Sequence, residues 1–62
     1  MTNEQWESVE NQLPTGTKIL RHYNAFENGE IRIIVKIPGI EYEQRYVAHI
    51  ERGDDVRLEH RP

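Results

Sequence analysis

The stretch from Tyr23 to Glu41, YNAFENGEIRIIVKIPGIE, decides the fold of this chain. It contains two turn signals, Asn28-Gly29 and Pro38-Gly39, and between them every odd position from 31 to 37 is a branched aliphatic residue. Side chains that alternate in this way point to opposite faces of a β-strand, so one face of the strand is apolar. The stretch therefore predicts a strand at residues 30–37 whose odd positions are buried in a core.

A helix is predicted before this strand, at residues 3–13. Thr2 can cap it, and Gln5 can return a hydrogen bond to the backbone of the cap, which makes a capping box. Pro14 ends the helix, because the residue before a proline disfavours α geometry. A single apolar stripe at helical spacing would rest on a sheet. The stripe consists of Trp6, Val9 and Leu13.

From Thr17 onward the apolar period changes from 3.6 to 2, which is typical of strands. The predicted strands are residues 17–26, 30–37, 42–51 and 55–60. Short turn sequences join them, so consecutive strands are expected to pair as an antiparallel meander. The predicted fold class is α+β, with an N-terminal helix packed on one face of a four-stranded antiparallel sheet, in two layers. The whole chain, residues 1–62, forms one small domain.

The first hairpin leaves the register of its strands open, because Asn28-Gly29 can form a loop of two or three residues. A two-residue loop places His22 and Asn24 on the core side, where an unpaired buried polar group costs about 1–3 kcal/mol. A three-residue loop places Tyr23 and Ala25 there instead. A slip of one residue moves the whole strand to the opposite face. We favour the three-residue loop.

Composition limits the class of protein. The chain has 62 residues and no cysteine, which excludes disulfides and thiolate metal sites and fits a cytoplasmic location. Folding at this size hides only about 60% of the surface of the unfolded chain, so a homo-oligomer, with a dimer favoured, would supply additional burial. No apolar run approaches the roughly 20 residues that cross a bilayer, and no membrane partner is expected.

Candidate catalytic and metal-binding residues form no known motif. The three histidines, His22, His49 and His60, show no helical i, i+4 spacing. The favoured register brings His22 and His49 to one face, where solvated histidines are the simpler interpretation and a metal site is the alternative. Ser8 is the only serine, and the sequence places no histidine to activate it. We expect no enzymatic activity, no catalytic residue, no metal and no cofactor.

The sheet face opposite the helix is expected to be open. Four apolar residues interrupt its polar pattern, and exposed apolar clusters often mark a contact with another protein. Two arginines lie among them in the predicted register. The candidate partner-binding residues are Leu20, Phe26, Arg32, Ile34, Arg45 and Val47.

Two other surfaces give alternative contacts. Glu4, Glu7 and Glu10 form an acidic helix face that could imitate a nucleic-acid backbone toward a basic partner. The open face carries six of the eight basic residues, which would suit nucleic acid or a nucleotide. The predicted pattern sends the tyrosines to the covered side, however, and glutamates dilute the positive charge. A small ligand clamped between subunits is a third alternative.

In size, in its net charge of −3 and in its lack of catalytic residues, the chain resembles the small accessory proteins of phages and other mobile elements. Many proteins of that kind act by occupying a surface on a larger protein. The resemblance and the open face lead to one hypothesis, a non-enzymatic protein-binding module that self-associates and modulates or blocks a larger partner protein. Nucleic-acid or nucleotide binding on the basic face is the alternative.

Overall fold

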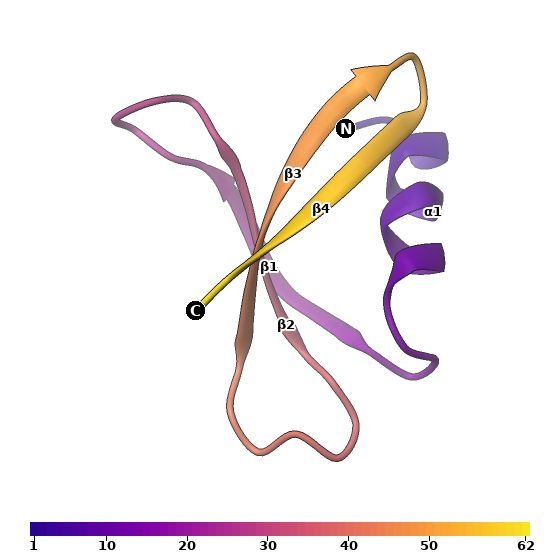
Figure 1. Cartoon of the computed structure of the whole chain (residues 1–62), viewed down its shortest axis with the longest axis vertical. Coiled ribbons are helices and arrows are strands. Elements are labelled where there is room, and N and C mark those ends of the chain that lie inside the picture. Colours follow the sequence, from indigo (N-terminus) through magenta and orange to yellow (C-terminus); the bar gives the residue numbers. More distant parts are fainter.

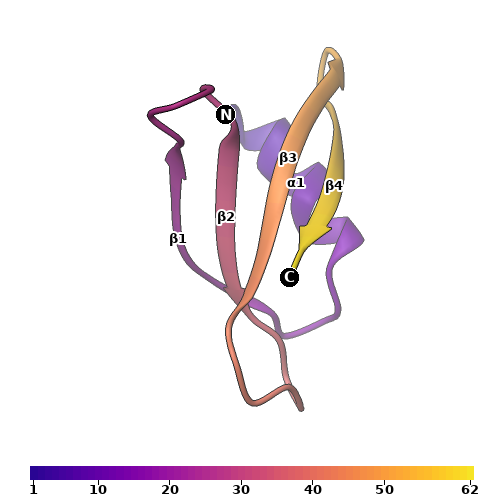
Figure 2. The ribbon, with the colours of Figure 1, turned by 60° about the vertical axis from the view of Figure 1, so that its left-hand side comes forward.

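The computed structural model describes residues 1–62 and has the predicted two-layer α+β architecture. One helix is followed by four strands, and neighbours in the chain are antiparallel neighbours in the sheet, in the order β1-β2-β3-β4. Figures 1 and 2 show the helix lying on one side of the twisted sheet. The elements are α1 (Asn3–Gln12), β1 (Lys18–Asn24), β2 (Ile31–Lys36), β3 (Gln44–Arg52) and β4 (Asp55–Arg61).

Helix α1 begins at the predicted residue and ends one residue before its predicted end. The residues that were expected to start and stop it do so. The Thr2 hydroxyl accepts a hydrogen bond from the Gln5 N–H at 3.1 Å, and Gln5 Oε1 accepts one from the Thr2 N–H at 2.8 Å. This capping box satisfies donors that the first turn leaves free. Leu13 is extended, with φ −104° and ψ 152°, because Pro14 follows it. The helix has neither the length nor the apolar character needed to cross a membrane.

The core lies between α1 and the sheet, as the alternation in β2 predicts. Val9 of α1 is completely buried, and so are Ile33 and Val35 of β2. Trp6 is half-buried at the edge of this cluster. The odd-numbered aliphatic residues of β2 are therefore the centre of the core. The full cluster consists of Val9, Ile33, Val35, Ile37, Ala48 and Val56.

The loop between β1 and β2 differs from both predicted loops. The Ala25 N–H donates to the Glu30 carbonyl at 2.7 Å, so four residues, 26–29, connect the two strands. The Gly29 N–H then donates back to the Ala25 carbonyl at 2.8 Å, and Gly29 takes a left-handed φ of 72°. Asn28 Oδ1 accepts from the Glu30 N–H at 3.0 Å. The predictions of two and three residues were wrong because this i+4→i turn buries Ala25, which Asn-Gly alone does not specify.

The side of the sheet that β1 presents to the core changes along the strand. His22 faces α1 and Tyr23 faces away, so the predicted placement of Tyr23 on the core side is wrong. A β-bulge at Leu20 inserts one extra residue and returns Ile19 to the core side. His22 avoids the expected burial penalty because β1 is an edge strand. Its ring stays exposed and packs against Trp6, with ring centroids 4.6 Å apart.

Side chains of α1 close the outer edge of β4. Gln12 Oε1 accepts from the Leu58 N–H at 3.3 Å, and Gln12 Nε2 donates to the Val56 carbonyl. Ser8 Oγ accepts from the Val56 N–H at 3.2 Å. These bonds occupy backbone groups through which an edge strand would otherwise pair with another chain. The remaining edge, β1, is interrupted by the bulge at Leu20.

Candidate contact surface on the open sheet face

The sheet face away from α1, here called the open face, is covered by no other element (Figure 1). Two rows of directly opposed residues cross its centre, one residue from each strand in turn. The first row is Tyr23, Arg32, Val47 and Glu59, and the second is Arg21, Ile34, Arg45 and Arg61. Four of these eight residues are arginines and one is a tyrosine, and both residue types are enriched at the energetic centres of protein interfaces.

The predicted exposed apolar patch does not exist as one surface. Ile34 is only 4% exposed and Val47 only 2% exposed, so the prediction that they are bare is wrong. Long side chains of the neighbouring strands lie over them, because arginine stems pack on apolar surface while their charged ends remain in water. Leu20 and Phe26 are exposed, at 45% and 104%, but Leu20 lies in the bulge and Phe26 in the β1–β2 loop.

A chain of ion pairs runs over the open face. The Glu30 carboxylate contacts Arg32 at 3.3 Å and Arg61 at 3.1 Å. Arg61 also contacts Glu59 at 3.0 Å, and Glu59 contacts His49 at 2.8 Å. Hydrogen bonds from Arg61 and then His49 lower the pKa of Glu59 to about 2. These pairs balance most of the positive charge of the open face.

Lys18 and Lys36 form no ion pair on this face, and among its arginines Arg45 alone lacks one. It lies at the centre of the open face and is exposed, and no carboxylate is paired with it. It also stands directly opposite Arg61, an arrangement of like charges that destabilises a sheet. An anion from outside the chain would relieve this repulsion. The other arginines of the face are paired: Arg21 with Glu43, Arg32 with Glu30, Arg57 with Glu51, and Arg61 with Glu30 and Glu59.

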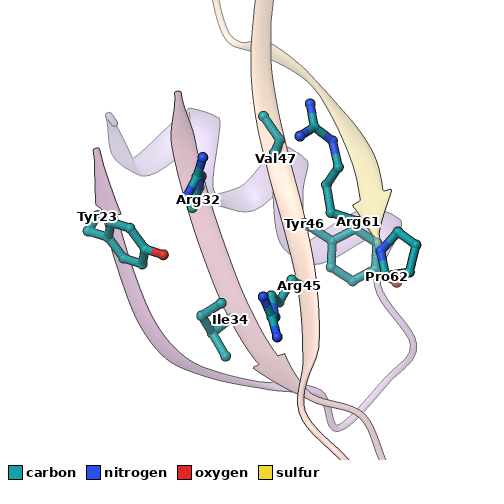
Figure 3. Close-up of a pocket in the computed structure, with 8 residues that line it drawn as sticks. All are labelled: Tyr23, Arg32, Ile34, Arg45, Tyr46, Val47, Arg61 and Pro62. Atoms are coloured by element: carbon teal, nitrogen blue, oxygen red, sulfur yellow. The ribbon is translucent and has the colours of Figure 1, made fainter. Parts of the chain in front are cut away.

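Two open hollows, of about 250 and 450 Å³, meet beside Arg45. Figure 3 shows the smaller one, in which Tyr23, Arg32 and Arg45 extend over the sheet. Ile34 and Val47 form its apolar floor. The nearby Tyr23 hydroxyl and then the hydrogen bond to Glu30 raise the pKa of Arg32. The hollow thus offers a free guanidinium, an aromatic ring and an apolar base to one incoming side chain.

The structure separates residues that the favoured register had brought together. His22 lies on the α1 side and His49 on the open face, so the metal site that they could have shared is not formed. Tyr46 does lie on the core side, beside His60, whereas Tyr42 is exposed in the β2–β3 loop. Tyr23 is the open-face residue that the sequence reasoning missed. The two-residue loop, which we did not favour, placed His22 and Asn24 on the core side and therefore Tyr23 on the open side, as the structure has them.

The opposite side of the molecule is acidic. Glu4, Glu7 and Glu10 are exposed on α1, and none of them takes part in an ion pair. The molecule therefore presents an unpaired cation on its sheet and unpaired carboxylates on its helix. Comparison of the chain with protein-family models, with curated proteins and with solved structures gave no match.

Proposed function

We propose that this chain is a non-enzymatic protein-binding module that self-associates through its open face. The observation that carries the proposal is the unpaired Arg45, which stands beside Tyr23 on a sheet face that no element of the chain covers. A paired surface of arginine, tyrosine and glutamate is stable in water by itself. An unpaired arginine opposite a second arginine gains by contact with an anionic group.

Self-association through the face is better supported than association through a strand edge. Gln12 and Ser8 occupy the backbone groups on the edge of β4, and the bulge at Leu20 interrupts the edge of β1. Both features oppose the addition of a further strand. The open face has no comparable obstacle, and a chain of 62 residues gains stability from the additional burial.

The second part of the proposal concerns a larger partner. A dimer joined through its open faces leaves two acidic helix faces directed outward, each with Glu4, Glu7 and Glu10. These faces suit a basic surface on the protein that the module modulates or blocks. The absence of cysteine agrees with a cytoplasmic setting for this complex.

Nucleic-acid binding remains the alternative, and the position of Tyr23 on the open face favours it more than the sequence did. The charge balance opposes it. Single-strand sites span roughly 4–16 nucleotides, each with a phosphate to neutralise. The central rows of the open face leave one arginine without a carboxylate. Titration of the protein with a labelled single-stranded nucleic acid at low salt distinguishes the two functions. Binding that is abolished by Arg45→Glu would favour the nucleic-acid alternative.

Site-specific photo-crosslinking tests the proposal. A benzophenone amino acid replaces Tyr23 on the open face, Glu7 on the acidic helix face or, as a control, Asp54 in the β3–β4 turn. After irradiation in cells that encode the chain, residue 23 should give a product of dimer mass and residue 7 a heavier adduct. The control should give neither. No dimer product from residue 23 would refute self-association through the open face.

A further inference from the structure

The β1–β2 loop presents an aromatic side chain that touches nothing in its own chain. Phe26 is fully exposed, more so than any other large hydrophobic residue of the protein. The loop that carries it is ordered by the backbone bonds between Ala25 and Glu30 and between Gly29 and Ala25. Phe26 is thus held in the solvent by a defined turn. An exposed phenylalanine at a fixed position is typical of an anchor that fills a pocket on another molecule.

The next residue adds a charge to this anchor. Glu27 is exposed and forms no ion pair with any residue of the chain. The tip of the loop therefore carries an aromatic ring and a free carboxylate side by side. A matching receptor needs an apolar base and an unpaired cation.

The hollow on the open face has both of these properties. Ile34 and Val47 form its base, Tyr23 supplies an aromatic wall, and Arg45 supplies the unpaired cation. The hollow and its neighbour beside Arg45 are both open to solvent, unlike the pockets that enclose most of the surface of a small molecule. One side chain of a protein is therefore a better occupant than an enclosed ligand.

The direction of the loop suggests which copy of the chain supplies that side chain. Figure 1 shows the β1–β2 loop projecting from the sheet on the side away from α1. When two open faces meet around a two-fold axis, the loop of each copy can reach the face of the other. Such an interface is self-complementary, so each copy would give one anchor and receive one.

We infer that the occupant of the open face is a second copy of this chain, with Phe26 and Glu27 of each copy seated at Arg45 of the other. Glu27 then neutralises the arginine that lacks a carboxylate, and Phe26 is covered by the apolar base and Tyr23. One contact thus explains both the uncovered Phe26 and the arginine of the open face that lacks a carboxylate.

This inference, which rests on the proposed function, is tested by variants that reverse one charge and by a mixture of two such variants with complementary charges. The molar mass of the wild type is measured by light scattering across a dilution series, and twice the 7.4 kDa of the chain is expected at high concentration. Phe26→Ala, Glu27→Lys and Arg45→Glu should each weaken the dimer by roughly tenfold or more. An equimolar mixture of Glu27→Lys and Arg45→Glu should restore it, because both contacts become complementary again.

Matched controls separate this contact from general effects of charge and fold. Glu41→Lys and Arg52→Glu reverse exposed, unpaired charges elsewhere and should leave the mass unchanged. Trp6 fluorescence verifies that every variant is folded. A wild type that remains monomeric overturns the inference, as does a dimer that withstands Phe26→Ala or a mixture that fails to recover. If the wild type is a dimer and residue 23 crosslinks into it, but the dimer withstands Phe26→Ala or the mixture fails to recover, the proposed function stands and the loop contact alone is wrong.

Discussion

The clearest test of the fold concerns Gln12, whose amide occupies the edge of β4 as a neighbouring strand would. The proposed change is Gln12→Met, which keeps the length and helix propensity of the side chain but removes its polar atoms. Two hydrogen bonds to β4 are lost, one from the Leu58 N–H and one to the Val56 carbonyl, together with the local bonds from Gln12 Nε2 to the Ser8 carbonyl and hydroxyl within the helix. Each such bond contributes a net 0.5–1.5 kcal/mol, roughly, to stability.

Two such bonds together contribute about 1–3 kcal/mol. Because water can reach this edge in the variant and bind the freed backbone groups, we expect a loss in the lower half of that combined range. We therefore expect the free energy of unfolding to fall by about 1–2 kcal/mol. In a domain of this size that corresponds to a decrease of roughly 5–15 °C in Tm. Urea unfolding followed by the fluorescence of Trp6, the single tryptophan, measures the change.

Two further variants show whether the amide geometry causes the loss. Asn11→Met adds the same side chain at the neighbouring exposed position and should change the free energy by less than about 0.5 kcal/mol. Gln12→Glu keeps an acceptor for Leu58 but loses the donor to Val56, so it should recover relative to the wild type below about pH 4, where its carboxyl protonates. If the urea midpoint of Gln12→Met equals that of the wild type, the Gln12 amide does not stabilise the edge of β4.

Three more predictions use the same unfolding assay. Thr2→Ala removes the capping box and should lower the free energy of unfolding by about 0.5–2 kcal/mol; an unchanged value would show that the cap contributes nothing. Ile34→Ala should lower it by about 2–5 kcal/mol and the exposed Leu20→Ala by less than about 0.5 kcal/mol, and equal effects would contradict the burial of Ile34. The pKa of Glu59 is lowered from 4.5 to about 2, so this carboxylate stabilises the fold above about pH 4.5 and its contribution is lost as the pH falls toward 2. Glu59→Gln should therefore flatten the decline of the urea midpoint over that interval, and a decline as steep as that of the wild type would count against the ion pairs.

The elements of the fold follow from local signals in the sequence. Thr2 and Gln5 specify the start of α1, Pro14 specifies its end, and the alternation in β2 identifies the buried side of the sheet. Each signal acts within a few residues. Such signals remain valid whatever the rest of the chain does, which is why the architecture and the buried odd-numbered side of β2 were predicted correctly.

The register of β1 depends on contacts that the sequence does not display. The β1–β2 loop is closed by the bonds from the Ala25 N–H to Glu30 and from the Gly29 N–H to Ala25, and the bulge at Leu20 then returns Ile19 to the core side. Two irregularities thus compensate for each other along one strand. The favoured three-residue loop places Tyr23 and His22 on the wrong faces and so alters the predicted composition of the open face, whereas the two-residue alternative has both on the observed faces.

The burial of Ile34 and Val47 shows how a chain with a single helix covers the second face of its sheet. No second helix is present, so the stems of arginines and the ring of Tyr23 shield these residues instead. The charged ends of such a cover must be neutralised, and the glutamates at positions 30 and 59 do this for Arg32 and Arg61. Among the arginines of the cover, Arg45 alone has no carboxylate partner. A contact at that point supplies what the chain itself lacks, so a partner should gain more binding free energy there than elsewhere on the face.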